Sequence, residues 1–228
     1  MGKIILLRHG ESQWNLENRF TGWTDVDLSD RGRMEAAEAG RKIAAAGLEP
    51  AYFFTSYLRR AIHTLQIAAA EMDRDWVPVV KDWHLNERHY GALQGLNKAD
   101  TAARYGDEQV HIWRRSYDVE PPALEKNDSR NPANEARYAA LTDDELPLTE
   151  SLKTTIERVR PCWEELIAPA VRLYGTVLVA AHGNSLRALA MMLLHLSPEE
   201  VMKLEIPTGS PWLMETDTHL NVVKNYYL

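Results

Sequence analysis

Two histidines each lie at the end of a predicted β-strand and directly precede a glycine. His9 follows the strand expected at residues 3–7, and His182 follows the strand expected at residues 176–181. Ligands of an open α/β sheet bind at the carboxyl ends of its strands, so both imidazoles are expected to face one crevice. A single histidine at a strand end more often only bonds a loop carbonyl. Two at equivalent positions, each beside a glycine that lets backbone approach a ligand, favour a functional site.

Positive charge is expected around the same crevice. Arg8 precedes His9, and Arg60 lies in the first turn of a predicted helix that begins near the same sheet edge. Residues 183–185 open another helix, whose free N–H groups and positive dipole end attract an anion. Such a set of groups suits a phosphoryl group better than a neutral or cationic ligand. For Arg60 the alternative is an ordinary surface charge.

Short apolar runs and helical periodicities alternate along the chain. Strands are expected at residues 3–7, 51–54, 76–80, 176–181 and, more weakly, 212–216. Helices are expected from residue 30 to near residue 47, from a cap at residues 55–56 to residue 72, and at 98–105, 107–115, 152–170 and 184–195. The long helix should bend at Pro161. The alternation predicts an α/β fold, a three-layer α/β/α sandwich with a mostly parallel mixed sheet.

Residues 85–148 carry little strand signal and lack an apolar run that could form a separate core. We interpret this segment as an insertion of helices and loops over the C-terminal ends of the strands, where it would cover part of the crevice. The whole chain, residues 1–228, is then predicted to be a single domain.

Charge and cysteine content exclude several classes of protein. The 228 residues carry 26 Lys and Arg against 33 Asp and Glu, a net charge of −7, and the pI is about 5.6. Bulk electrostatics therefore disfavours binding to nucleic acid or to an anionic membrane. The single cysteine, Cys162, can form neither an intrachain disulfide nor a thiolate metal site, and it indicates a reducing compartment. No apolar stretch reaches the roughly 18 residues of a membrane span, so a cytoplasmic protein is expected.

Six segments carry a family resemblance: RHGESQWN at 8–15, FTGW at 20–23, LRRAIHT at 58–64, LNERHYGALQG at 85–95, WRR at 113–115 and AHGNS at 181–185. Together they resemble the 2,3-bisphosphoglycerate-dependent phosphoglycerate mutases, which belong to the histidine phosphatase superfamily. Arg-His-Gly alone would indicate only the superfamily. The segments 87–91 and 113–115, both within the insertion, are narrower and point to the mutases.

The resemblance implies a role for each catalytic side chain. His9 would be the nucleophile that forms a phosphohistidine, and Arg8 and Arg60 would disfavour its cationic form. His182 and the two arginines would stabilise charge on the phosphoryl oxygens. Glu87 would be the general acid/base, although spacing alone does not distinguish it from Glu11. The remaining groups would bind substrate, together with Arg8, Arg60 and Glu87: Asn15, Thr21, Gly22, Arg88, Tyr90, Lys98, Arg114, Arg115, Gly183 and Asn184.

The predicted function is a phosphoglycerate mutase of glycolysis and gluconeogenesis. It would interconvert 3-phosphoglycerate and 2-phosphoglycerate, with 2,3-bisphosphoglycerate as primer and no metal. Its partners would be small phosphoglycerates. Whether the chain forms a homo-oligomer, either a dimer or a tetramer, is left open by the sequence. One alternative is a bisphosphoglycerate synthase or phosphatase, or a broader histidine phosphatase; Ser12 resembles the mutases, whereas the synthases look as if they carry a smaller residue there. A non-catalytic phospho-ligand sensor is an alternative of another class, which intact His9, Glu87 and His182 disfavour.

Overall fold

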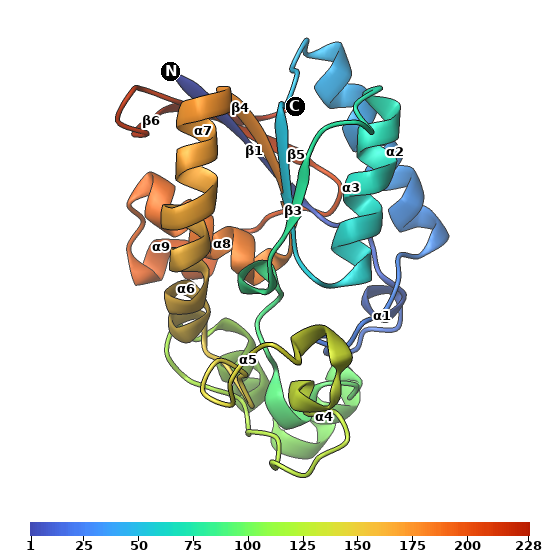
Figure 1. Ribbon diagram of the computed structural model, residues 1–228. Coiled ribbons are helices and arrows are strands. Elements are labelled where there is room, and N and C mark those ends of the chain that lie inside the picture. The colour runs from blue at the N-terminus through green and yellow to red at the C-terminus, as the bar shows by residue number, and fades with distance from the viewer.

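A six-stranded mixed sheet forms the centre of the computed structural model, which describes residues 1–228 (Figure 1). Its strands are β1 (Gly2–Arg8), β2 (Tyr52–Thr55), β3 (Val79–Lys81), β4 (Thr176–Ala181), β5 (Pro211–Thr216) and β6 (Val222–Tyr227). They lie in the order β3-β2-β4-β1-β5-β6; the first four are parallel, and β5 and β6 are antiparallel to their neighbours. In the β1–β4 pair Arg8 lies opposite Ala181. The histidines that follow these two residues therefore start at the same sheet edge.

Helices cover both faces of this sheet. They are α1 (Gln13–Leu16), α2 (Asp30–Ala45), α3 (Arg59–Glu71), α4 (Lys98–Tyr105), α5 (Asp107–Arg115), α6 (Leu152–Pro161), α7 (Ala168–Tyr174), α8 (Gly183–Leu194) and α9 (Pro198–Lys203). Successive strand residues point to opposite faces. Ile4 and Leu6 therefore pack with residues of α6, α7 and α8, whereas Ile5 and Leu7 pack with residues of α2 and α3. The predicted three-layer sandwich with a mostly parallel mixed sheet is confirmed.

Local sequence signals set several helix ends. The Ser29 hydroxyl accepts a hydrogen bond from the Gly32 N–H, which caps α2. Gly47 follows that helix with φ +65°, the left-handed geometry that glycine adopts without strain. The predicted start and end of this helix are thus confirmed. None of the helices is both long and apolar enough to cross a membrane.

Other predicted elements differ from the structure. The strand expected at 76–80 is only the three residues of β3, and the helix expected from residues 55–56 begins at Arg59 with Leu58 as its cap. The long helix is not simply bent at Pro161, because a π-helical segment, Cys162–Ile167, follows that residue and joins α6 to α7. The edge strand β6 was not predicted, since five of its six residues are exposed and its pattern does not alternate.

Residues 85–148 lie beyond the carboxyl ends of the strands, below the sheet in Figure 1. They contain α4, α5 and short 3₁₀ turns, and two small apolar clusters hold them to the loop after β1. In one cluster Trp23 packs with Trp83 and Tyr138, and in the other Phe20 packs with Leu93 and Val110. The segment thus packs against the rest of the chain and covers the sheet edge where His9 and His182 begin.

Candidate active site

A polar pocket opens between the carboxyl ends of β1 and β4 and the segment 85–148. It encloses about 130 Å³, which is less than the roughly 300–1,000 Å³ of a site for a drug-sized ligand. The residues that line it are Arg8, His9, Asn15, Arg19, Phe20, Thr21, Gly22, Arg60, Glu87, Tyr90, Lys98, Arg114, Arg115, Gly183, Asn184, Arg187, Glu205 and Ile206. All predicted site residues are among them except His182 and Arg88.

His9 is held at the end of β1 in one orientation. Its ring is 3% exposed, and Nδ1–H donates to the Gly10 carbonyl oxygen at 2.7 Å. This contact leaves the lone pair on Nε2, which faces the Arg60 Nε at 3.3 Å. A Cβ on Gly10 would clash with the Gly32 carbonyl of α2, so the glycine is needed for the close approach of the two segments. His9 can therefore present Nε2 as a nucleophile.

Both histidines are neutral at physiological pH. Burial holds the pKa of His9 well below its usual value, and the Arg60 and Arg8 cations lower it further. Burial and the charge of Arg60 likewise lower the pKa of His182. The His182 ring lies under His9, with 5.0 Å between ring centroids. Its Nε2 bonds the Ser56 hydroxyl at 2.7 Å, and this hydroxyl also accepts from the Leu58 N–H at 3.1 Å, ahead of α3. The cap residue of α3 is Leu58, whereas Ser56 was predicted.

Arg60 supplies a buried positive charge beside the nucleophile. Its side chain comes from the first turn of α3, is 1% exposed, and donates to the carbonyls of Thr24 and Gly22 at 3.0 and 2.8 Å. Burial lowers the pKa of Arg60 to about 10, so the group stays cationic at neutral pH. The expected surface-charge alternative is thereby excluded. Two fixed carbonyls and His9 orient this guanidinium before any ligand binds.

The Glu87 carboxylate has one oxygen bound by the protein and one facing the pocket. Oε1 accepts hydrogen bonds from the Arg88 N–H at 2.8 Å, the Asn184 N–H at 3.0 Å and the Asn184 side chain at 2.9 Å. Oε2 lies beside Gly183, near the Arg8 guanidinium. Burial raises the pKa of Glu87, but these donors and the Arg60 and Arg8 cations outweigh it and hold the pKa below its usual value. Glu87 is therefore ionised and can accept a proton.

Glu11, the other carboxylate considered from the sequence, does not line the pocket. Its Oε1 accepts from the Ser29 hydroxyl at 2.8 Å, next to the start of α2. Ser12 also lies behind the pocket wall, where its hydroxyl accepts from the Asn15 N–H and its own N–H donates to Asn15 Oδ1. Ser12 thus orients Asn15, which does line the pocket.

Arg88 differs from its predicted place. The side chain is 1% exposed and donates to the carbonyls of Trp113 and Arg114 at 3.0 and 3.2 Å. It also stacks on the Tyr90 ring, 4.4 Å from the centroid. The last carbonyls of a helix lack hydrogen-bond donors within the helix, and the Arg88 guanidinium is such a donor at the end of α5. It therefore holds the helix that carries Arg114 and Arg115 and does not face the pocket.

Three charged residues of the pocket were not predicted. Arg19 and Arg187 add two guanidinium groups, and Glu205 adds a carboxylate that pairs with Arg115 at 2.7 Å and Arg187 at 3.6 Å. Arg187 donates to Asn184 Oδ1 one turn earlier on α8. Residues three apart on a helix lie on the same face, so the position of Arg187 three residues after the predicted site residue Asn184 could have predicted that it lines the pocket. Arg19 and Glu205 lie in loops, where no periodicity places a side chain.

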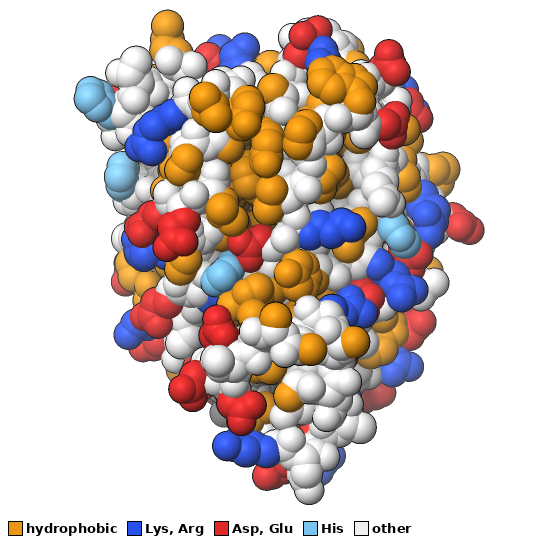
Figure 2. All heavy atoms as spheres, viewed as in Figure 1, with side chains coloured by type: hydrophobic (Ala, Val, Ile, Leu, Met, Phe, Trp, Pro, Cys, Tyr) orange, Lys and Arg blue, Asp and Glu red, His pale blue; other side chains and the backbone are white.

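The pocket concentrates cations. Seven of its side chains are Arg or Lys, and two, Glu87 and Glu205, are carboxylates. On the outer face in Figure 2, by contrast, basic and acidic side chains are intermixed. No group of three or more His, Cys, Asp or Glu side chains is arranged to hold a metal ion. The charge that the pocket offers to an anion comes from guanidinium and ammonium groups.

Solved structures with the same fold include phosphatases. A mycobacterial glucosyl-3-phosphoglycerate phosphatase in complex with VO3 aligns over 100% of this chain and 97% of its own, with a TM-score of 0.73 and 24% identity. YhfR of Bacillus stearothermophilus aligns over 94% of this chain and 91% of its own, with a TM-score of 0.69 and 22% identity. A putative α-ribazole-5′-phosphate phosphatase from Escherichia coli aligns over 100% of this chain and 94% of its own, with a TM-score of 0.68 and 19% identity.

These likenesses establish the shared fold, and the sequence adds the family. The match to the family model described as histidine phosphatase superfamily (branch 1) runs over residues 4–227 and so reaches from β1 to the end of β6. With His9, Arg8 and His182 at the ends of the two central strands, the chain belongs to branch 1 of the histidine phosphatase superfamily.

Proposed function

We propose that the protein is a 2,3-bisphosphoglycerate-dependent phosphoglycerate mutase that works through phospho-His9. The observation that carries this proposal is the charge of the pocket, with seven cations and two carboxylates around about 130 Å³. One phosphoryl group needs only the charges next to His9. The cations farther from His9, on α4, α5 and α8, suit a small ligand with at least one more anionic group, such as a phosphoglycerate.

In the first half-reaction Glu87 Oε2 takes the proton from the 2-hydroxyl of 3-phosphoglycerate. The freed oxygen attacks the phosphorus of phospho-His9, the P–N bond breaks, and 2,3-bisphosphoglycerate and neutral His9 result. Arg8, Arg60 and His182 stabilise charge on the phosphoryl oxygens during transfer, the requirement that dominates such reactions. The low pKa of Glu87 fits a base that is ionised when the substrate arrives.

In the second half-reaction His9 Nε2 attacks the 3-phosphoryl group of the bisphosphate. The P–O bond breaks, the leaving oxygen takes the proton from Glu87, and 2-phosphoglycerate and phospho-His9 result. Protons and phosphoryl groups balance over the cycle. Free 2,3-bisphosphoglycerate primes the enzyme by the same attack once Glu87 has taken a proton from solvent. The bisphosphate donates a phosphoryl group to His9, its leaving oxygen takes that proton, and a monophosphate leaves.

A phosphatase is the second candidate, and the likeness to the mycobacterial phosphatase favours it. That protein is a glucosyl-3-phosphoglycerate phosphatase, and the compound in its name contains a phosphoglycerate group. In a phosphatase, water would take the place of the phosphoglycerate hydroxyl, with Glu87 as its base, and phospho-His9 would release inorganic phosphate.

Product analysis distinguishes the two candidates. The purified protein is incubated with 3-phosphoglycerate, with and without catalytic 2,3-bisphosphoglycerate, and with a His9→Ala variant as control. A mutase forms 2-phosphoglycerate at a rate that rises with the bisphosphate, with far less inorganic phosphate. Stoichiometric phosphate without 2-phosphoglycerate would instead assign the protein as a phosphatase.

A further inference from the structure

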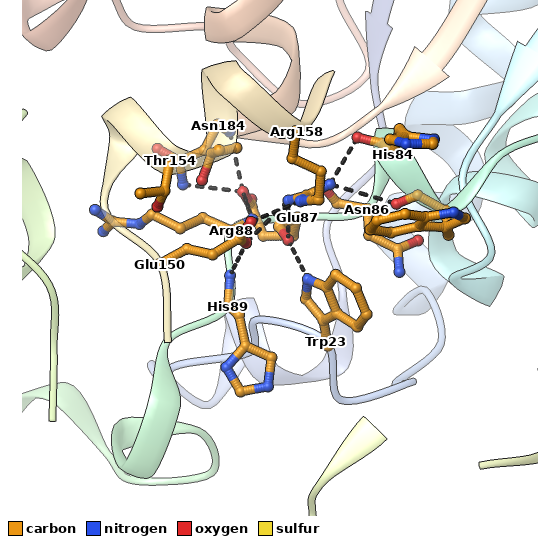
Figure 3. A network of polar contacts seen from close by, with 12 residues as sticks. Trp23, His84, Asn86, Glu87, Arg88, His89, Glu150, Thr154, Arg158 and Asn184 are labelled. Carbon is orange, nitrogen blue, oxygen red and sulfur yellow. Dashed lines mark hydrogen bonds and ion pairs between the residues drawn. The ribbon is translucent and has the colours of Figure 1, made fainter. Parts of the chain in front are cut away.

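Arg158 contacts the segment that carries Glu87 at four backbone positions. The side chain comes from α6 and is 7% exposed. Its Nη1 donates to the carbonyls of His84 and Trp83 at 2.6 and 3.3 Å, and Nη2 donates to those of Glu87 and Asn86 at 3.1 and 3.2 Å. Figure 3 shows Arg158 between this segment and Glu150. One guanidinium group therefore fixes most of the peptide units from 83 to 87.

Glu150 holds Arg158 and the next peptide together. Its carboxylate binds Arg158 Nε at 2.6 Å and Nη2 at 3.0 Å, and it accepts the His89 N–H at 2.8 Å. Glu150 directly precedes Ser151, the cap of α6, whose hydroxyl accepts from the Thr154 N–H. The start of α6 thus fixes the carboxylate, and the second turn of the same helix presents the guanidinium.

The Glu87–Arg88 peptide unit links this contact to the pocket. Its carbonyl oxygen accepts from Arg158 and from the Trp23 indole N–H at 2.6 Å. A trans peptide is planar, with C=O and N–H on opposite sides. Donors that fix the carbonyl therefore also aim the Arg88 N–H, and this N–H binds Glu87 Oε1 at 2.8 Å. The direction of the Glu87 carboxylate depends on how its own carbonyl is held.

We propose that Arg158, paired with Glu150, is a positioning residue that sets the orientation of the Glu87 carboxylate for proton transfer. The inference rests on the proposed role of Glu87 as proton carrier. A buried ion pair is weak support for stability, because apolar side chains of similar volume often serve as well. The fork of a guanidinium group offers something that apolar packing lacks, namely several donors in a fixed plane toward carbonyls.

The test compares Arg158→Met with Arg160→Met, a matched change on the same helix at an exposed arginine whose ion-pair partner is Glu164. Arg158→Met should lower kcat by about 10–100-fold, the size expected when a reacting group is misplaced. KM should change by less than about threefold, since no substrate contact is removed. Arg160→Met should retain the native kcat. Circular dichroism and thermal melting verify that both variants are folded.

Two phosphoryl donors with different leaving groups distinguish a misplaced Glu87 carboxylate from a general disruption of the active site. The oxygen that leaves 2,3-bisphosphoglycerate needs a proton, whereas the phenolate that leaves 2,4-dinitrophenyl phosphate does not. Transfer to His9 from the phenyl ester should therefore fall by less than about threefold in Arg158→Met, because this step does not need Glu87. Equal losses with both donors would overturn the proposal.

A double-mutant cycle with Glu87→Gln provides an independent test. If Arg158 acts through the carboxylate, Arg158→Met should change kcat by less than about threefold once Glu87 is replaced. An undiminished effect in that background contradicts the proposal. Glu150→Gln, which keeps the side-chain volume but replaces one of the two accepting oxygens with an NH2 donor, gives the same comparison if Arg158→Met does not fold. If the native protein proves to be a phosphatase, each of these variants can be compared by its rate of phosphate release. The positioning role of Arg158 can therefore be tested even if the proposed mutase activity is wrong.

Discussion

The pocket has two regions that differ in how their charges are fixed. We call His9, Arg60 and Glu87, together with His182 packed against the His9 ring, the floor, and Lys98, Arg114, Arg115 and Glu205 the rim. The floor side chains are at most 9% exposed and bind backbone or one another. Arg115 and Glu205 on the rim are 33% and 64% exposed and pair with each other across two segments. The floor is preorganised for one chemical step, whereas the rim can exchange an internal partner for a ligand.

The difference teaches where each kind of function is placed. Proton and phosphoryl transfer need reacting groups within a fraction of an ångström, and buried hydrogen bonds give that precision. Ligand capture needs charge that a diffusing anion can reach, which requires exposure. Changes to the floor should therefore alter kcat, and changes to the rim should alter KM.

Loss of the nucleophile should have the largest effect on the floor. His9→Ala should abolish turnover of 3-phosphoglycerate and the acid-labile, base-stable phosphoryl label formed from 2,3-bisphosphoglycerate, because no other neutral imidazole lines the pocket. The matched variant His182→Ala should retain slow labelling, since it removes a charge-stabilising group and keeps Nε2 of His9. A persistent label on His9→Ala would place the nucleophile elsewhere.

Removal of the proton carrier comes next. Glu87→Gln keeps the hydrogen bonds to Oε1 that Asn184 and the Arg88 N–H donate, and it removes the basic oxygen. We expect kcat to fall by about 10²–10⁴ with little change in KM. Glu11→Gln is the control, because Glu11 lies outside the pocket. Steady-state kinetics of both variants decide the assignment, and a nearly native kcat for Glu87→Gln would contradict it.

The rim should respond differently. Arg115→Ala removes one half-buried guanidinium and should raise the KM for 3-phosphoglycerate about tenfold, the value of a modest charge-assisted hydrogen bond. The kcat should stay within about threefold, because His9 and Glu87 keep their partners. Arg104→Ala, a change on α4 outside the pocket, is the control. A fall in kcat with unchanged KM would show that floor and rim are not separable in this way.

Buried neutral histidines also link the floor to pH. The pKa values of His9 and His182 are held well below 6.5, and burial lowers the pKa of His89 to about 3. The unfolded chain binds protons on these rings below about pH 6.5, whereas the folded chain does not. Their contribution to folding stability is therefore complete above that pH and falls as pH decreases through the range down to the folded pKa values.

Urea unfolding between about pH 7.5 and 5 measures this loss, within the range where unfolded histidine gains its proton. Replacement of His89 by Asn should reduce the pH-dependent part by about a third, since one of three equivalent rings is removed. His89 does not line the pocket, so its replacement leaves the lining of the active site unchanged when the stabilities of the native protein and the variant are compared. A slope that is unchanged in the variant would show that His89 is protonated in the folded state.

Residue types and spacing alone located three of the four floor residues, whereas Glu87 and the rim residues Lys98, Arg114 and Arg115 came only from the family resemblance. His9 and His182 were predictable because strand ends in a parallel sheet converge, and Arg60 because a helix start lies nearby. Arg88 was misplaced, since no pattern shows that its guanidinium turns toward the carbonyls of α5. Glu205 was missed because a loop has no periodicity to aim a side chain. Contacts between segments far apart in the chain, such as Arg158 with residues 83–87, depend on packing that one sequence does not display.

The smallest expected effect concerns Glu205, which occupies the rim as an internal anion. Its carboxylate neutralises Arg115 and lies near Arg187, so an anionic ligand must compete with it for these two guanidinium groups. Glu205→Gln should lower the KM for 3-phosphoglycerate by about twofold to fivefold, the value of an exposed ion pair, and leave kcat unchanged. Glu49→Gln, which breaks the exposed pair with Arg74, is the matched control. High salt should shrink the difference between native and variant KM, because it screens exposed charges. If Glu205→Gln instead raises KM, the carboxylate holds Arg115 in its binding position, and the rim is preorganised like the floor.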